Sequence, residues 1–251
     1  MQSITLKQLA KVSPDAIASI LAGPPERAAP WIAAAAGHGI VEAQAVYGQC
    51  LLDGHGVERD EAAAVTWFKH AAASDHPMAM NMLGRCYEHG RGVAACAPVA
   101  VYWYRLAARA GLDWGMYNYA SALARGFGIE RDRAQALAWF RRAADLGHAK
   151  SINFVGSFYE DGWEVHADSL VALGCYRRAA LGGDFRGQFN YARLLGERGH
   201  IDEALRWLAR VPRTATPAFL AKMHAYLSAS PIAAFRAMTQ GRPAPHQEFS
   251  A

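Results

Sequence analysis

The residues best suited to catalysis or metal binding are ten histidines and four cysteines, but their spacing supports neither chemistry. No His-Glu-x-x-His motif, Gly-x-Ser-x-Gly elbow or Walker-type loop occurs in the sequence. Glu160 and Asp161 are adjacent, so on a helix they diverge by about 100°, which weakens any carboxylate pair. Histidines such as His76 and His148 fit turn or capping positions. We predict that the protein is not an enzyme and has no catalytic, cofactor-binding or metal-binding residues.

Chemistry for binding is better represented, because amides, rings and cations recur in four columns with a spacing of 36 residues. The columns read Glu42, Met78, Trp114, Lys150, Arg186; Ala45, Asn81, Tyr117, Asn153, Phe189; Val46, Met82, Asn118, Phe154, Asn190; and Gln49, Arg85, Ser121, Ser157, Arg193. Asparagine is a poor helix former, so four of them at helix-interior positions need a reason. An amide offers two donors and an acceptor, enough to pair with the backbone of an extended peptide. The cations favour acidic groups or a terminal carboxylate.

The same period organises the rest of the chain. Trp31, Trp67, Trp103 and Trp139 stand 36 residues apart, and Cys175 takes the next position in an otherwise unchanged frame. A period in this range marks stacked repeats, in which each unit buries its apolar face against its neighbours. We therefore interpret the tryptophan column as core rather than as a ligand cage.

The stretch from His76 to Gly111 shows how one repeat forms. Met78 to His89 has apolar residues at helical spacing, and the following Gly90-Arg91-Gly92-Val93 ends that helix and reverses the chain. Pro98 opens a second helix, where its missing N–H has no cost. Aspartates precede the equivalent second helices at positions suited to N-caps. These are Asp60, Asp132 and Asp168.

The columns combine into the pattern A-x-x-x-(L/Y)-G-x-x-Y-x-x-G-x-G-V-x-x-D-x-x-x-A-x-x-W-F-x-x-A-A-x-x-G. This pattern resembles the Sel-1-like repeat family, a branch of the tetratricopeptide-like α-solenoids, over about residues 40 to 212. The resemblance implies an all-α, right-handed α-solenoid of about five helix hairpins. It also implies adaptor or scaffold roles rather than catalysis.

Departures from the pattern lie at the ends and define the expected domains. The fourth repeat has Glu164 in place of the second turn glycine, and the fifth reads as a plain tetratricopeptide hairpin with a short turn. Ser13-Pro14, Thr216-Pro217 and Ser230-Pro231 look like N-cap and N1 pairs, the last two for helices near 217–228 and 231–239. The expected segments are an N-terminal helical cap (1–39), repeats at 40–75, 76–111, 112–147, 148–183 and 184–212, a C-terminal helical cap (213–240) and a flexible tail (241–251).

The resemblance places the first helix of each repeat on the concave surface, and the non-consensus positions of these helices then face a groove. We predict that this groove binds a protein or peptide segment. Its predicted residues are Met78, Asn81, Met82, Arg85, Trp114, Tyr117, Asn118, Lys150, Asn153, Phe154, Arg186, Phe189, Asn190 and Arg193. The alternative is structural: asparagines could bond loops of the neighbouring repeat, and aromatic rings could pack between first helices.

The cysteines fit reduced thiols. Cys50 and Cys86 occupy equivalent positions on successive repeats, too far apart for a disulfide. Cys86 and Cys96 are the one pair that could meet, and secreted relatives can be stapled in this way. Reduced core or boundary thiols are the preferred interpretation.

Composition limits the remaining choices. A net charge of +4, without a basic stripe, disfavours nucleic acid, and the sequence has no apolar run long enough for a membrane span and no secretory signal. We expect a cytoplasmic monomer or weak oligomer whose partner is a protein or peptide, acidic or with a free carboxylate. The first alternative is an accessory subunit docking on an enzyme, since relatives are sometimes encoded beside iron/2-oxoglutarate-dependent hydroxylases linked to iron uptake. The second is a hydrolase.

Overall fold

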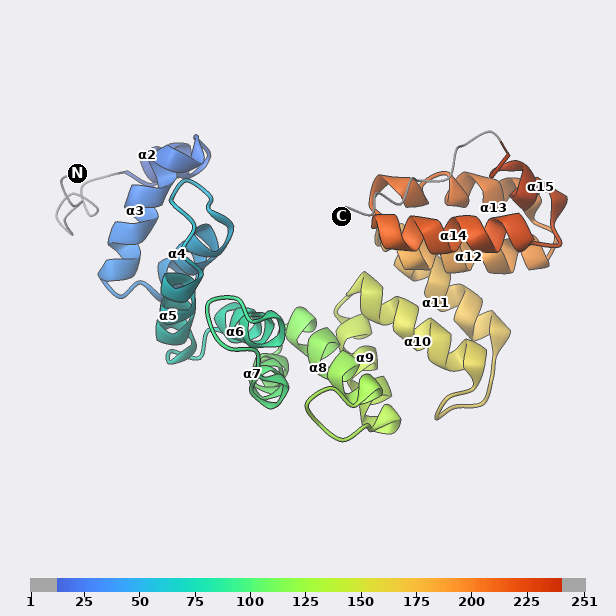
Figure 1. Ribbon diagram of the computed structural model, residues 1–251, viewed down its shortest axis with the longest axis horizontal. Coiled ribbons are helices and arrows are strands. Elements are labelled where there is room, and N and C mark those ends of the chain that lie inside the picture. Colours follow the sequence, from blue (N-terminus) through green and yellow to red (C-terminus); the bar gives the residue numbers. More distant parts are fainter. Residues whose placement is uncertain (1–12, 241–251) are drawn as a thin grey trace, which may run out of the picture. The chain divides into compact units, whose positions relative to one another are not determined.

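The computed structural model describes residues 13–240, and every regular element in that range is a helix (Figure 1). The chain forms two compact units, residues 1–139 and 140–251, which divide inside α9 (Arg133–Asp145). The 36-residue repeats in the sequence do not predict a boundary between two units inside a helix.

Unit 1 contains α2 (Pro14–Leu21), α3 (Pro25–Gly37), α4 (Val41–Asp53), α5 (Glu61–Ala72), α6 (Pro77–His89), α7 (Ala97–Arg109) and α8 (Asp113–Arg125). Unit 2 contains α10 (Ala149–Asp161), α11 (Ser169–Leu181), α12 (Phe185–Glu197), α13 (Ile201–Leu208), the 3₁₀ turn η1 (Val211–Arg213), α14 (Pro217–Ala229) and α15 (Ala233–Ala237).

Within the repeats, the loop glycines and aspartates end and begin helices where the sequence predicts. The first helices α4, α6, α8 and α10 end at a left-handed glycine, for example Gly90 after α6. The predicted aspartate caps are confirmed: the side chain of Asp60 accepts from the Ala63 N–H at 2.9 Å, and Asp132 and Asp168 bond equivalent N–H groups. His76 and His148 are also N-caps, since their side chains accept from Ala79 N and Ser151 N.

The second loop glycine packs each repeat onto the preceding one. Gly92 has φ 69°, and a Cβ there would lie 2.1 Å from the carbonyl oxygen of Glu61, in the first turn of α5. The loop of one repeat thus lies directly on the backbone of the previous second helix. In the fourth repeat the equivalent Glu164 keeps the same left-handed conformation at φ 58°, which is unfavourable for a residue with a side chain.

We expect substitutions at Glu164 to follow the strain of this conformation. Glycine should raise the free energy of unfolding by about 0.5 kcal/mol, because relief of the left-handed strain exceeds the added flexibility of the unfolded chain. Valine should lower it by about 1 kcal/mol, because a branched side chain fits this region worse than glutamate. Urea denaturation of the three proteins checks the order, and a valine variant as stable as the parent would contradict it.

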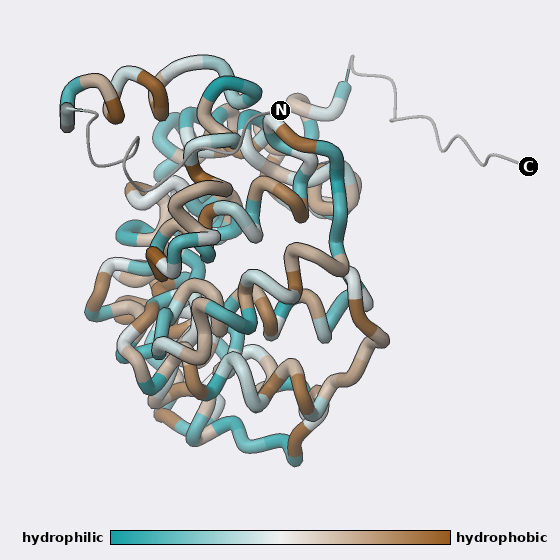
Figure 2. The backbone as a smooth tube through the Cα atoms, turned by 90° about the vertical axis from the view of Figure 1, so that its left-hand side faces the viewer, coloured by the Kyte–Doolittle hydropathy of each residue, from teal (hydrophilic) through white to brown (hydrophobic). Residues whose placement is uncertain are grey.

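Alanines and one ring per repeat form the interior. Ala71, Ala107, Ala143 and Ala179 are fully buried, as are the rings that follow the tryptophan column. These rings are Phe68, Tyr104, Phe140 and Tyr176. Figure 2 shows the resulting alternation of hydrophobic and hydrophilic residues along the helices.

The tryptophans themselves are less buried than the sequence predicts. Trp67 and Trp139 are half-buried and pack edge-on against Tyr47 and Tyr119, at centroid distances of 5.5 and 5.7 Å. The deepest position belongs to the next residue because the first helix passes closest there: a Cβ at Gly84 would lie 2.5 Å from the Tyr104 ring. Trp67 and Trp139 therefore pack at the edge of their hairpins, and the following ring fills the centre.

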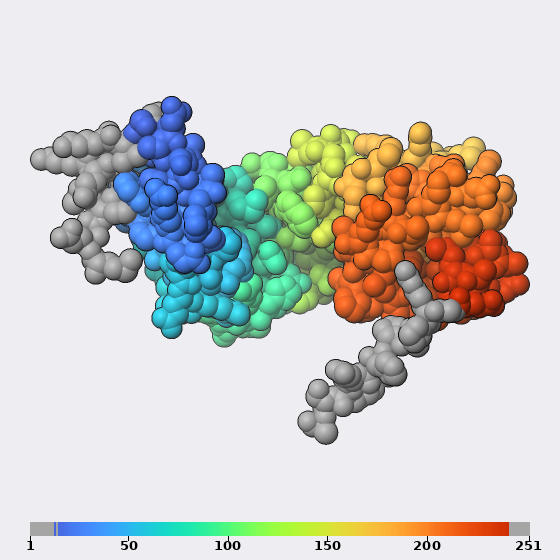
Figure 3. Space-filling view, turned by 90° about the horizontal axis from the view of Figure 1, so that it is seen from above, coloured from blue at the N-terminus to red at the C-terminus, as the bar shows by residue number. Residues whose placement is uncertain are grey.

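Two of the three predicted Ser-Pro or Thr-Pro helix starts are confirmed near the ends of the described range, and the third is corrected. The Ser13 and Thr216 side chains cap α2 and α14, and α12 and α13 form a hairpin with a short turn. The last helix is shorter than predicted: Ser230 ends α14, and α15 begins only after Ile232. The side chain of Ser230 instead accepts a hydrogen bond from the Ile232 N–H at 3.2 Å. In Figure 3, α15 lies in red on the surface of unit 2. The predicted tail at 241–251 and residues 1–12 of the predicted N-terminal cap lie outside the described residues.

Candidate binding face on the first helices of the repeats

In unit 1, the predicted groove residues lie on α6 and α8, which are joined by an amide pair. Asn118 Nδ2 donates to Asn81 Oδ1 at 2.8 Å. Asn81 is only 3% exposed and Met82 is also buried, whereas Asn118 is half-buried. Asn81 therefore links the two helices, and neither Asn81 nor Met82 is exposed enough to present its side chain to a partner.

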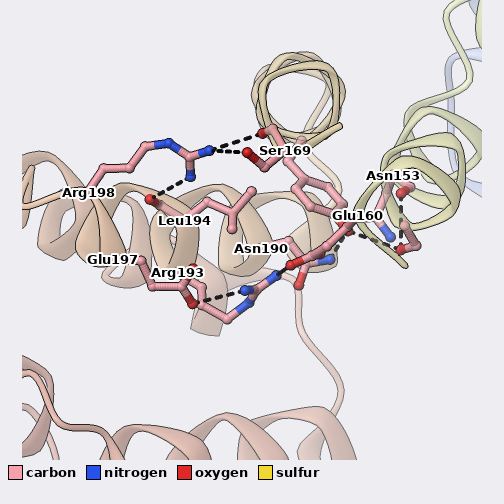
Figure 4. Close-up of polar contacts among 10 residues, drawn as sticks. Asn153, Glu160, Ser169, Asn190, Arg193, Leu194, Glu197 and Arg198 are labelled. Carbon is pink, nitrogen blue, oxygen red and sulfur yellow. Dashed lines mark hydrogen bonds and ion pairs between the residues drawn. The ribbon is translucent and has the colours of Figure 1, made fainter. Parts of the chain in front are cut away.

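Unit 2 repeats this arrangement on α10 and α12 (Figure 4). Asn190 Nδ2 donates to Asn153 Oδ1 at 2.9 Å, and Asn153 is 4% exposed. A buried amide without a partner would be costly, so each pair satisfies its members while it fixes the register of neighbouring first helices. For Asn81 and Asn153, these bonds favour the structural interpretation over ligand binding. Each of them bonds another asparagine, however, and not a loop of the neighbouring repeat.

A sequence signal for these pairs exists at a spacing of 37 rather than 36 residues. Asn81 with Asn118 and Asn153 with Asn190 have this separation. A residue on one first helix meets the residue one step further along on the next. The columns of the sequence compare equivalent residues, whereas contacts join residues of two adjacent columns.

The exposed members of the predicted set lie in unit 1. Met78 on α6 is 41% exposed and Trp114 on α8 is 39% exposed, with the Trp114 ring edge-on to Tyr117 at 6.1 Å. Arg85 is exposed, and its Nη1 donates to the Met82 sulfur at 3.8 Å, which is a weak contact. We call Met78, Arg85, Trp114, Tyr117 and Asn118 the α6–α8 face.

In unit 2, the equivalent positions are largely occupied by internal packing. Phe189 meets Phe219 and Tyr226 of α14, and the Arg186 guanidinium lies 4.5 Å from the ring centroid of Phe185. Phe154 stacks on Phe140 at 4.8 Å. Lys150 is half-buried, and its charge opposes the rise that burial causes in the pKa of Asp184. Helix α14 therefore packs on Phe189, one of the rings that the sequence predicts for a ligand.

A glutamate near the end of the first helix centres a polar network in each unit. In unit 1, Tyr104 Oη donates to Glu88 Oε2 at 2.6 Å, and Arg125 lies 3.6 Å from the same carboxylate. Burial, then the bond to Glu88, raises the pKa of Tyr104 well above its usual range, so the hydroxyl stays protonated as a donor. The charges of Arg85 and Arg125 oppose that rise, which places both guanidinium groups near this network.

In unit 2, the corresponding network contains a second carboxylate. Tyr176 Oη donates to Glu160 Oε2 at 2.7 Å, and Arg193 pairs with both Glu160 and Glu197 (Figure 4). Burial lowers the pKa of Arg193, but the two carboxylates outweigh this effect and raise it overall. The Arg193 charge, predicted to bind a ligand, is therefore neutralised within the chain.

Several further sequence-based expectations can be compared with the described residues. All four cysteines are free thiols, including Cys86 and Cys96, and burial raises the pKa of Cys86 to about 11. Within residues 13–240, no three histidine, cysteine or acidic side chains gather closely enough to hold a metal ion. In the same range, no helix has the length and apolar character needed to cross a bilayer.

Helix hairpins that stack through repeated alanines, loop glycines and paired first helices define a helical repeat protein. The Sel1 repeat model matches residues 41–76, 77–112, 115–148 and 149–184, more than half of the chain. The protein belongs to the Sel1 repeat family, which confirms the resemblance predicted from its sequence. Proteins of this family are generally protein-interaction scaffolds.

Solved structures support the same fold. A protective antigen of uropathogenic Escherichia coli, c5321, described as displaying an SLR fold, shares 27% identity and a TM-score of 0.71 over 89% of this chain and 50% of its own. This chain thus spans about half the length of that relative. A Sel1 repeat protein from Oxalobacter formigenes has 24% identity and a TM-score of 0.73, covering 83% of this chain and 87% of its own. The immunity protein Pa5087 of Pseudomonas aeruginosa is more distant, with 17% identity and a TM-score of 0.55 over 80% and 75% of the two chains. Among curated proteins, no significant match was found.

Proposed function

We propose that this protein is a non-catalytic scaffold that binds an acidic segment of a partner protein on the α6–α8 face of unit 1. The observation behind the proposal is the contrast between the two units. Met78, Arg85 and Trp114 are exposed at the surface of unit 1. In unit 2, Phe189, the equivalent of Tyr117, packs on α14, and Arg193, the equivalent of Ser121, pairs with Glu160 and Glu197.

The chemistry of this face suits an extended peptide. Met78 and Trp114 offer flexible and rigid apolar contact area, respectively, which is typical of the centres of protein interfaces. Asn118 uses one amide hydrogen for Asn81, so its carbonyl oxygen and second amide hydrogen can pair with a peptide backbone. Arg85 supplies a positive charge beside them.

Site-specific photo-crosslinking tests the location of the interface. A benzophenone amino acid is introduced at position 78 on α6, or at position 102 on α7 as a control of similar exposure, since Tyr102 is 47% exposed. After irradiation in cells, we expect a discrete protein adduct from position 78 and little from position 102. Adducts from position 102 alone would contradict the proposal and favour docking through the second helices.

A further inference from the structure

The two polar networks are equivalent parts of a longer repeat, because four of their residues recur after two repeats. Asn81, Glu88, Tyr104 and Asn118 correspond to Asn153, Glu160, Tyr176 and Asn190, each 72 residues later. Both sets make the same bonds: asparagine to asparagine, and tyrosine hydroxyl to glutamate.

The intervening repeats lack this chemistry. The positions equivalent to Tyr104 hold Phe68 and Phe140, and those equivalent to Glu88 hold Leu52 and Ala124. Neither phenylalanine can donate a hydrogen bond, and neither Leu52 nor Ala124 can accept one through its side chain. The polar network therefore belongs to every second repeat, once in each unit.

The arginines and glutamates around the two networks differ, and this difference reverses the local charge. Around Glu88 the three variable positions are Arg85, Ser121 and Arg125; around Glu160 they are Ser157, Arg193 and Glu197. With its central glutamate, the first network has two positive charges and one negative, whereas the second has one positive and two negative.

The arginines of the two networks also differ in their exposure and in the carboxylates that they contact. Arg193 is largely buried between its two carboxylates, with 17% of the side chain exposed. Arg125 is 60% exposed and lies 3.6 Å from Glu88, whose carboxylate already accepts from Tyr104. Its Nε donates to the Ser121 carbonyl oxygen at 3.1 Å, and its guanidinium lies 5.4 Å from the centroid of the Phe127 ring. Arg85 has no carboxylate partner within residues 13–240. Among the described residues, unit 1 therefore presents two guanidinium groups that are not held between two carboxylates, whereas unit 2 has serine and glutamate at the equivalent positions.

We infer that Arg85 and Arg125 form the anion-selective position of the α6–α8 face, and that the change to Ser157 and Glu197 removes this selectivity from unit 2. The inference rests on the proposed function and deepens it, because it names the residues that select the partner. The bound group is an anionic side chain: a carboxylate or a phosphoryl group fits a guanidinium fork equally well. Such binding weakens as salt screens the charges.

Fluorescence anisotropy of labelled peptides tests this selectivity. One probe alternates glutamate with alanine, a second replaces one glutamate with phosphoserine, and a third has lysine in place of every glutamate. We expect the intact protein to bind an anionic probe in preference to the lysine probe. Arg85→Gln and Arg125→Gln should each weaken that binding about fivefold. Arg109→Gln, an exposed arginine at the end of α7, is the matched control and should bind as the parent does.

Moving the two arginines to the equivalent positions of unit 2 tests whether their placement, and not only the net charge of the protein, determines the preference for an anionic peptide. In the protein with Arg85→Gln and Arg125→Gln, the further changes Ser157→Arg and Glu197→Arg should restore binding of the anionic probe, now through unit 2. The inference is overturned if the intact protein binds neither anionic probe, if the arginine variants bind like Arg109→Gln, or if the variant with the moved arginines does not regain binding although circular dichroism shows that it is folded. Cross-linking from position 78 would persist in each of these cases if the face binds a partner by other means, so failure of the proposed function remains distinguishable.

Discussion

Replacing Gly92 with alanine is expected to lower the free energy of unfolding by about 3 kcal/mol. Two effects add: alanine is strained at φ 69°, and its Cβ would fall 2.1 Å from the Glu61 carbonyl oxygen, so the loop must move away from α5. In a chain of this size, such a loss lowers the melting temperature by on the order of 10 °C. Thermal denaturation followed by circular dichroism measures the shift.

Gly111 provides the matched control for this substitution. It also has a left-handed conformation, at φ 89°, but a Cβ there would meet no atom within 4 Å. Gly111→Ala should therefore cost only the backbone strain, about 1 kcal/mol. Equal losses from the two variants would show that the contact between the loop and the preceding second helix contributes nothing to stability.

Replacing Arg193 with alanine is expected to cost about 2 kcal/mol, the second-largest effect. Arg193 is largely buried and neutralises Glu160 and Glu197, so its removal leaves two carboxylates facing each other with no cation between them. Part of the cost is relieved because Glu197 is 46% exposed and can turn toward water. Urea denaturation measures the loss.

Two further variants define the origin of that cost. Arg193→Lys keeps the charge but lacks the planar fork, and it should lose about half as much stability. Glu197→Gln should change stability by less than about 0.5 kcal/mol, because an exposed ion pair contributes little. If Arg193→Ala unfolded at the same urea concentration as the parent, the network in Figure 4 would have no structural role.

Most of the fold could be predicted from the sequence because its determinants are local and repeated. The left-handed glycine after each first helix, the aspartate caps such as Asp60, and Pro98 each act within a few residues. Ser230 shows the limit of this reasoning: a serine followed by proline resembles a helix start, yet the chain extends two residues further before α15 begins.

The candidate face was less predictable, because exposure depends on neighbours that periodicity does not identify. Asn81 and Asn153 are predicted as ligand contacts, but both are buried and each is bonded by the asparagine 37 positions later. Arg193 was predicted as a free cation, but its partner Glu160 lies 33 residues earlier, on another helix. Phe189 was predicted for a groove, but α14, which belongs to no repeat of the pattern, packs on it. Met78, Arg85 and Trp114 remain candidates because their side chains are exposed.

Hydroxyl-radical footprinting of the complex with a partner recovered by cross-linking tests the central claim most directly. Met78 and Trp114 are both reactive side chains with substantial exposure, and Tyr102 and Trp163 serve as internal references of similar exposure. We predict that partner binding protects Met78 and Trp114 from oxidation and leaves Tyr102 and Trp163 unchanged. Unchanged oxidation of Met78 and Trp114, with protection at Tyr102 or Trp163, would contradict recognition through the α6–α8 face.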